Sequence, residues 1–168
     1  MQTIFTSPVT HSSSRARAAA QAALKLAQTT GLTTSIDPAS SSGITQVGPY
    51  SWLDWTGGID LCFPNEDEAC LLGGEGSSEA NACRLTDVYG EVVVKLGSAG
   101  AVWCNRRGDT LAVPAGDAEI VDTTGAGDAF CAGFLAGWLR GASPEANLQA
   151  AVALSSVVVS QVGGRPLP

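Results

Sequence analysis

The sequence has few of the residues from which metal sites and catalytic triads are built. His11 is the only histidine among 168 residues, and its serine-rich surroundings are typical of an ordinary loop. The cysteines are odd in number and contain no Cys-x-x-Cys pair; they are Cys62, Cys70, Cys83, Cys104 and Cys131. These absences disfavour a zinc site and a Ser-His-Asp triad. Buried free thiols in a reducing cytosol explain the cysteines better than disulfide bonds do.

Charged residues are also scarce, and the basic ones are outnumbered. Only 15% of the residues are charged, with 9 Lys and Arg against 16 Asp and Glu, which gives a formal net charge of -7. A broad basic surface that holds a polyanion is therefore not expected, and nucleic acid is disfavoured as a partner. A nucleotide remains compatible with this charge, because backbone N–H groups at a helix N-terminus bind phosphate without cationic side chains.

Long apolar runs are missing as well. No stretch reaches the roughly 18 consecutive apolar residues of a membrane span, and Met1 to Pro8 lack the basic start and apolar run of a signal peptide. Internal repeats and low-complexity tails are likewise absent from the sequence. The length suits one domain with a real core. We therefore expect a single α/β domain over residues 1–168, cytoplasmic and without a membrane partner.

The pattern of apolar residues predicts helices that alternate with short strands. Helices are expected over residues 15–29, 65–72, 78–86, 127–139 and 144–162. Strands are expected over residues 32–37, 59–63, 91–96, 101–104, 110–113 and 119–121. Residues 39–58, rich in Ser, Gly and Pro, indicate a long surface connection with one helical turn near residues 51–55. This alternation predicts a three-layer α/β fold around a mostly parallel sheet with some hairpin.

The segment from Asp122 to Phe130, with the sequence DTTGAGDAF, carries the sharpest functional pattern. Its two glycines and alanine leave the turn bare, so an anionic group can approach the N–H groups at the start of the following helix. Such a turn suits the charge that develops on a transferring phosphoryl group. Asp128, in the first helical turn, is favoured as an ionised carboxylate that accepts a hydroxyl proton. An ordinary glycine-rich turn explains a shorter motif, but this run is more specific.

Two further motifs have ordinary structural explanations when taken alone. Asn65 is a good helix N-cap, and the acidic residues that follow, up to Glu68, suit the first turn of a helix. The stretch from Lys95 to Ala101 reads as a tight turn between two strands.

The segment from Asp122 to Phe130 resembles the C-terminal signature D-T-x-G-A-G-D-x-F of ribokinase-like (PfkB) kinases. The resemblance implies that the backbone of Gly125, Ala126 and Gly127 forms an anion hole beside a nucleotide-binding Thr124. It also implies that Asp128 is the catalytic base that deprotonates the acceptor hydroxyl. The expected fold is then the ribokinase-like three-layer fold, and the expected donor is ATP.

The same resemblance assigns roles to the two ordinary-looking motifs. Asn65 and Glu68 match the N-x-x-E motif that helps to place Mg²⁺ and the phosphates, often through water. Gly97 and Gly100 match a segment that borders the nucleotide, and Lys95 could reach a phosphate. Asp122, with the backbone of residues 158–164, corresponds to the monovalent-cation (K⁺) site of some members.

The resemblance covers nearly the whole chain but only the second half of a family member. Nothing matches the N-terminal glycine pair, the early Asp and Asn that bind the sugar, or the β-strand lid. A shortened gene product, a misplaced start codon and an expressed fragment all stay open as reasons for this. Because lid closure excludes water and positions the acceptor, we expect the isolated chain to be a poor kinase. An exposed sheet edge is expected to reduce its solubility.

The leading hypothesis is an ATP-dependent phosphotransferase that acts on an alcohol group of a sugar or related carbohydrate. A nucleoside acceptor and a catalytically incomplete nucleotide-binding module are the alternatives. A dinucleotide-binding oxidoreductase is disfavoured, because no G-x-G-x-x-G follows a first strand. The expected partner is a small sugar. The resemblance implies a homodimer as one option for the full-length form, because dimers of the family commonly pair through the lid, and the oligomeric state stays open.

Overall fold

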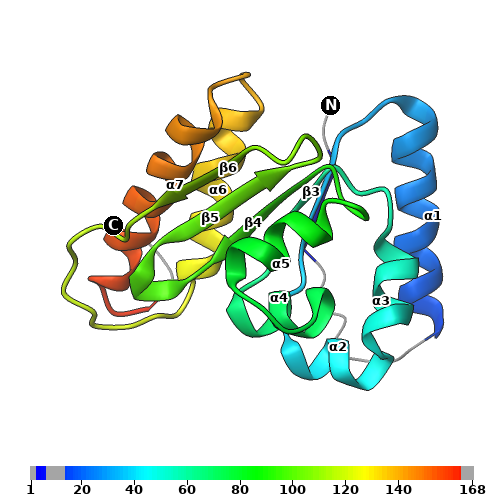
Figure 1. Ribbon diagram of the computed structural model, residues 1–168, viewed down its shortest axis with the longest axis horizontal. Coiled ribbons are helices and arrows are strands. Elements are labelled where there is room, and N and C mark those ends of the chain that lie inside the picture. Colours follow the sequence, from blue (N-terminus) through cyan, green and yellow to red (C-terminus); the bar gives the residue numbers. More distant parts are fainter. Residues whose placement is uncertain (1–2, 7–13, 164–168) are drawn as a thin grey trace. The chain divides into compact units, whose positions relative to one another are not determined.

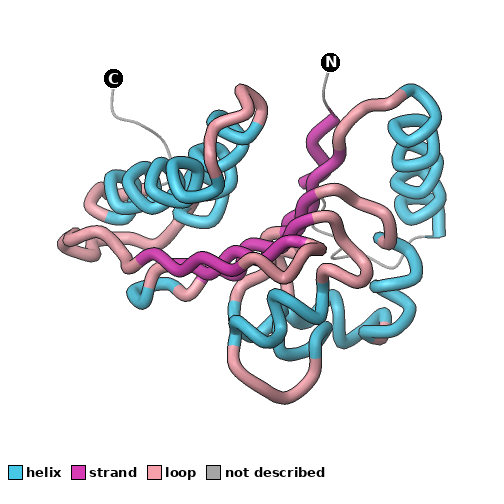
Figure 2. The backbone as a smooth tube through the Cα atoms, turned by 45° about the horizontal axis from the view of Figure 1, so that its top comes forward, coloured by secondary structure: helices cyan, strands magenta, loops and turns pink. Residues whose placement is uncertain are grey.

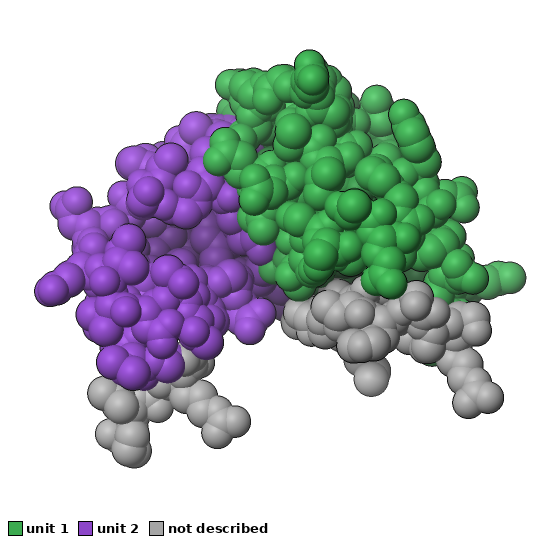
Figure 3. Space-filling view, turned by 90° about the horizontal axis from the view of Figure 1, so that it is seen from below, with its two compact units in different colours: residues 1–94, 104–110 green, residues 95–103, 111–168 purple. Residues whose placement is uncertain are grey.

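The chain divides into two compact units (Figure 3). A computed structural model describes residues 3–6 and 14–163, so His11 lies outside the described residues. The first unit comprises residues 1–94 and 104–110, and the second comprises residues 95–103 and 111–168. The single domain expected over residues 1–168 stays a prediction.

The secondary structure alternates as the sequence predicts (Figure 1). In chain order the elements are β1 Thr3–Thr6, α1 Ser14–Thr30, β2 Thr34–Asp37, α2 Ser41–Val47, α3 Pro49–Thr56, β3 Leu61–Cys62, α4 Glu66–Gly73, α5 Ser78–Leu85, β4 Glu91–Lys95, the short 3₁₀ helix η1 Gly97–Ala99, β5 Ala101–Asn105, β6 Thr110–Val113, α6 Ala126–Trp138 and α7 Pro144–Val159. The described strands form one six-stranded sheet in chain order, and β1 to β4 run parallel. The predicted α/β class with a mostly parallel sheet is confirmed.

Burial of β2 and β4, together with hydrogen bonds at the start of β2, holds the parallel strands of the first unit in place. All four residues of β2 are buried, as are the three central valines of β4. Such continuous burial is typical of parallel strands that are covered on both faces. At the start of β2, the N–H and the hydroxyl of Thr34 donate to the Asp60 carboxylate at 2.7 and 2.9 Å. This pairing sets the register of β2 against β3 and brings the carboxyl ends of the two strands to the same edge.

Residues 39–58 are more helical than the surface connection that the sequence predicts, and the helical turn expected near residues 51–55 lies within a longer helix. They form α2 and α3, seen in Figure 2 as two consecutive helical coils. Ser40 caps α2 by accepting the Gly43 N–H at 3.2 Å, and Pro49 occupies the first turn of α3, where a missing N–H costs nothing. Trp52 is only 1% exposed, so burial of this side chain holds α3 in place. Four of the residues that suggested a loop, Ser40, Gly48, Pro49 and Gly57, stand at the helix ends.

The strand predicted over residues 119–121 is also wrong. The segment has no regular secondary structure, and Ile120 and Val121 are 62% and 51% exposed. Its backbone bonds to the end of α7 instead of to a strand, with the Val121 and Asp122 N–H groups both donating to the Val159 carbonyl. The apolar residues 119–121 therefore suggested a strand. In the structure their backbone bonds to the end of a helix and not to a neighbouring strand.

The prediction of free cysteines is corrected for two of the five. Cys83 of α5 and Cys104 of β5 form a disulfide bond with their Cα atoms 5.3 Å apart. The other three form no disulfide bond, and Cys62 and Cys131 are buried as expected while Cys70 is exposed. The pairing depends on α5 folding against β5, and a separation of 21 residues in the sequence does not reveal that contact.

In the second unit, α6 and α7 lie side by side at close range (Figure 1). A Cβ atom at Gly133 would come within 2.8 Å of the Ala150 carbonyl oxygen, so only glycine permits this approach. Phe134 and Leu148 fill the interface and are fully buried. Although α6 is largely apolar, no helix in the described part of the chain is both long and apolar enough to cross a bilayer.

Reduction of the Cys83–Cys104 disulfide should lower the free energy of unfolding by about 2–4 kcal/mol, because the bond closes a loop in the unfolded chain. Urea denaturation with and without a phosphine reductant measures this difference. The Cys70→Ser variant is the control, because it removes an exposed free thiol and should show the same sensitivity to the reductant. Alkylation of all five thiols in the unreduced, denatured chain would contradict the assignment.

Candidate functional site

The turn that leads into α6 is shaped by Gly125. This residue is the N-cap of α6 and adopts φ 81°, a left-handed conformation that favours glycine. The Ala126 N–H donates to the Thr123 carbonyl at 3.1 Å, which closes the turn just before the helix begins. With no side chain at Gly125 or Gly127, the first turn of α6 presents bare backbone, where N–H groups lack helical acceptors.

Asp122 anchors this turn through both oxygens of its carboxylate. One oxygen accepts the Thr124 N–H and the other accepts the Gly163 N–H, each at 2.9 Å. Hydrogen bonds from the backbone and side chain of Thr124, together with the Gly163 N–H, lower the pKa of the Asp122 carboxyl below its ordinary value. The group therefore stays ionised at neutral pH and keeps accepting both bonds.

A pocket of about 290 Å³ opens in the second unit beside this turn. Its volume lies near the lower end of the range for small-molecule sites. The lining comes from the end of β4 and η1, the segment before the turn, the start of α6 and one face of α7. The residues are Lys95, Gly97, Ser98, Gly100, Ala115, Gly116, Ala118, Ile120, Thr123, Ala126, Gly127, Phe130, Val152, Ser155, Ser156 and Val159.

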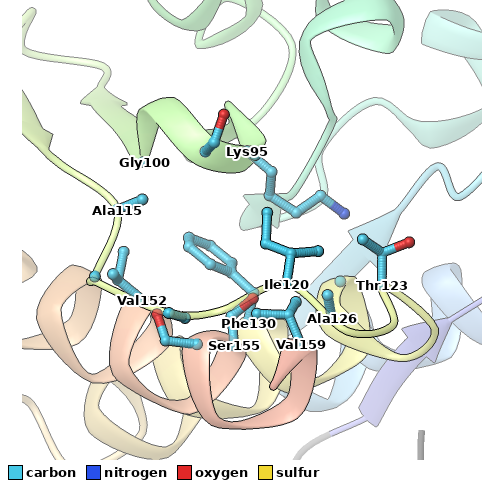
Figure 4. A pocket seen from close by; sticks show the side chains of 16 residues that line it. Lys95, Gly100, Ala115, Ile120, Thr123, Ala126, Phe130, Val152, Ser155 and Val159 are labelled. Atoms are coloured by element: carbon cyan, nitrogen blue, oxygen red, sulfur yellow. The ribbon is translucent and has the colours of Figure 1, made fainter. Parts of the chain in front are cut away.

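The pocket has two chemically different ends (Figure 4). The Lys95 side chain extends toward the end where Thr123 and Ala126 lie, at the start of α6. The Phe130 ring and Val152 lie toward the opposite end. A cationic side chain and helical N–H groups suit an anion, whereas an aromatic ring and a branched aliphatic side chain suit a flat apolar group.

The wall formed by η1 depends on Gly100. The Leu96 N–H donates to the Gly100 carbonyl at 2.9 Å, and the Gly100 N–H donates to the Gly97 carbonyl at 3.1 Å. Gly100 adopts φ 100°, and a Cβ atom there would overlap the Val113 carbonyl oxygen. Gly97, with φ 57°, has open space around it. Close packing therefore requires glycine at residue 100, whereas at residue 97 only the backbone conformation favours it.

The structure brings together most of the site residues predicted from the second half of the chain. Five of them line the pocket, namely Lys95, Gly97, Gly100, Ala126 and Gly127. Four others lie in the adjoining turn without lining it, namely Asp122, Thr124, Gly125 and Asp128. Asp128 is exposed in the first turn of α6, and the Thr124 N–H is bonded to Asp122.

Several lining residues were missed by the sequence analysis. The segment over residues 115–120 contributes four of them, and its mixture of small and apolar residues carries no recognisable motif. Gly116 is the clearest example, because a Cβ atom there would meet the Ser156 hydroxyl at 2.7 Å. Only the contact with α7 shows why this residue is a glycine.

Asn65 and Glu68, the predicted magnesium residues of the first unit, form a capping box. The Asn65 side chain accepts the Glu68 N–H at 2.8 Å, and the Glu68 carboxylate accepts the Asn65 N–H at 2.9 Å. Glu68 is 1% exposed. Among the described residues, no three His, Cys, Asp or Glu side chains are grouped as a metal site. The ordinary helix start is therefore present, and the metal role of this pair stays a prediction.

Comparisons with known proteins show which family and fold this chain resembles. Residues 3–168 match the pfkB family carbohydrate kinase. An ATP-dependent ribose-1-phosphate kinase from Halopiger xanaduensis is 34% identical over 159 residues, which cover 94% of this chain and 50% of that protein. The crystal structure of an adenosine kinase from Sinorhizobium meliloti superposes with a TM-score of 0.88 at 27% identity, covering 98% of this chain and 50% of that one. A putative ribokinase II from Escherichia coli, solved with ATP and Mg²⁺, has a TM-score of 0.82 at 27% identity, covering 96% and 54%. The chain thus spans about half the length of these relatives.

The Gly100→Ala variant should destabilise the second unit more than Gly141→Ala does. Both glycines have positive φ, and Gly141 has open space around it, so its replacement costs only the left-handed backbone penalty of about 1–2 kcal/mol. At Gly100 the added methyl group also overlaps the Val113 carbonyl oxygen. Thermal unfolding of the two variants compares these costs. Equal losses in melting temperature would show that the turn relaxes and that Gly100 is not required by packing.

Proposed function

The chain belongs to the pfkB family of carbohydrate kinases, and we propose that its second unit binds ATP in the pocket beside the Gly125 turn. The protein would then transfer the terminal phosphoryl group to an alcohol group of a sugar or related carbohydrate. Because the chain spans about half the length of its relatives, the activity of the whole protein is part of this proposal. Relatives named as kinases of ribose 1-phosphate and of adenosine support a sugar or nucleoside acceptor.

The two-ended pocket is the observation that carries this proposal. A nucleotide has a flat, largely apolar base at one end and a run of anionic phosphates at the other. In the pocket, Phe130 and Val152 suit the base, while Lys95 and the start of α6 suit the phosphates. The order of these features along the pocket supports a nucleotide over a purely apolar or purely anionic ligand.

The turn at residues 125–127 would act on the phosphoryl group in transfer. Charge spreads over its outer oxygens as the bond to the leaving ADP lengthens. Fixed N–H groups at a helix start stabilise that charge without reorganising, and the helix dipole adds to the effect. The left-handed Gly125 sets the direction of these groups before any ligand arrives.

Asp128 would act as the base toward the acceptor. It lies in the first turn of α6, directly after the bare backbone of Gly127, and it is exposed. The acceptor hydroxyl gives its proton to the Asp128 carboxylate while its oxygen forms a bond to the γ-phosphorus, and the bond between that phosphorus and the β-phosphate oxygen breaks to release ADP. An ionised carboxylate is the form that accepts the proton.

Magnesium and a monovalent cation belong to the proposal as well. Mg²⁺ neutralises phosphate charge when it is bound. A magnesium role for Asn65 and Glu68, which form the capping box of α4 in the first unit, stays a prediction. Asp122 could share a K⁺ with backbone carbonyls, since an ionised carboxylate accepts more than the two N–H groups it holds. The cytoplasmic location and the homodimer stay predictions.

Calorimetric titration with Mg-ADP tests the binding site. The wild-type chain should bind, and Gly127→Val should weaken binding at least tenfold, because a branched side chain at the start of α6 blocks the approach of phosphate to the backbone. Ala132→Val is the matched control, since it places the same side chain on an exposed position of the same helix. Equal affinity in all three proteins would place the nucleotide elsewhere.

The Asp128→Asn variant separates catalysis from binding. Removing a negative charge near the phosphates should leave Mg-ADP affinity unchanged or slightly higher. In a form of the protein that phosphorylates an acceptor, kcat should fall by about 10²–10⁴, which is the usual contribution of a general base. Coupled detection of ADP measures the rate. Normal turnover by the variant would show that another group takes the proton.

A further inference from the structure

We infer that Asp122 is a positioning residue that holds the turn at the phosphate end of the pocket against the end of α7. This inference rests on the proposed function for the identity of the ligand. Asp122 does not line the pocket. Its carboxylate joins the turn that forms the phosphate end to the chain that follows α7, and α7 lines one wall of the pocket.

The two bonds of Asp122 reach segments that are far apart in the sequence. The Thr124 N–H bond lies within the turn itself, two residues away. The Gly163 N–H bond spans 41 residues and comes from the chain just beyond α7. Each bond uses a different carboxylate oxygen. The Asp122 side chain therefore connects the turn to the chain that follows α7.

Backbone hydrogen bonds run beside this carboxylate. The N–H groups of Val121 and Asp122 both donate to the Val159 carbonyl, at 2.8 and 3.1 Å. That carbonyl belongs to the last turn of α7, where a helix leaves its C=O groups without partners. Val159 itself lines the pocket. Three hydrogen bonds connect residues 121–122 to Val159 and Gly163, and we call this set of bonds the strap. Two of them are backbone bonds, and the third is made by the Asp122 carboxylate.

The hydrogen-bonding groups around Asp122 distinguish a residue that holds two segments together from one that stabilises only its own turn. An aspartate that only stabilised its own turn would need one acceptor oxygen, as in an ordinary Asx turn. Here two N–H donors face the two oxygens of one carboxylate, and a negative charge strengthens both bonds. Asparagine has one acceptor oxygen and one NH₂ donor. It can keep the Thr124 bond, but its NH₂ group would then face the Gly163 N–H, donor against donor.

A loosened strap should shift the turn relative to α7. Thr123, Ala126 and Gly127 line the phosphate end and follow directly on Asp122, whereas Val152, Ser155 and Val159 line the wall from α7. A ligand that contacts both the turn and this wall needs them at a fixed separation. Loss of the Gly163 bond should therefore reduce nucleotide affinity even though Asp122 lies outside the pocket lining.

Amide hydrogen exchange and Mg-ADP titration of Asp122→Asn, Asp122→Ala and Asp117→Asn test the inference. Asp117 is an exposed aspartate of the same unit, so its variant controls for the loss of one negative charge. We expect the Gly163 amide to lose protection in both Asp122 variants, the Thr124 amide to lose it only in Asp122→Ala, and affinity to fall at least tenfold in both. The control should behave as the wild type. Affinity within twofold of the wild type for Asp122→Asn, or a Gly163 amide that exchanges freely in the wild type, would overturn the inference.

Two further arms distinguish positioning by Asp122 from cation binding and from failure of the nucleotide site itself. The titrations are repeated with choline chloride in place of potassium chloride. An equal loss of affinity in both salts supports positioning, whereas a loss seen only with potassium overturns it in favour of a cation ligand. If the wild-type chain binds no nucleotide, the proposed function fails by itself. The exchange pattern at Gly163 and Thr124 then decides whether the strap exists, and circular dichroism confirms that each variant is folded.

Discussion

The site depends on one backbone constraint, the left-handed conformation of Gly125. That conformation turns the chain so that α6 begins at Ala126, whose N–H donates to the Thr123 carbonyl, and the backbone at Gly125 and Gly127 carries no side chain. Any other residue at φ 81° would pay about 1–2 kcal/mol and would place a side chain where an anion has to approach. Asp122 holds the turn from one side by accepting two N–H groups, and α6, which begins from this turn, carries Phe130 to the other end of the pocket. Phosphate recognition and base recognition therefore share one short segment.

Sequence reasoning succeeded where the signal is local. The glycines of residues 125 and 127, the Asn65 cap and the valines of β4 each specify structure through their own backbone preference or burial, and the structure has the turn, the helix start and the buried strand at these places. The pfkB family match confirms the resemblance drawn from the same residues. The fold class followed from the alternation of helices and strands, which is also a local pattern.

Features that depend on distant contacts could not be predicted in this way. The Cys83–Cys104 disulfide needs α5 beside β5, and the irregular path of residues 119–121 needs the Val159 carbonyl as an acceptor. The helix α2 was missed, and α3 was predicted only as one turn near residues 51–55, because Ser40, Gly48 and Pro49 mark helix ends as readily as loops. The burial of Trp52 distinguishes a packed helix from a loop here. The long-range bond of Asp122 to Gly163 belongs to the same class.

The central claim is that one nucleotide contacts both ends of the pocket in the second unit. Backbone amide NMR spectra of the isotopically labelled chain, recorded during titration with Mg-ADP, test it most directly. The account predicts that the largest shifts occur together at Ala126 and Gly127 and at Phe130 and Val152, with one shared dissociation constant. Shifts confined to one of these pairs, or centred on residues outside the pocket, would contradict it.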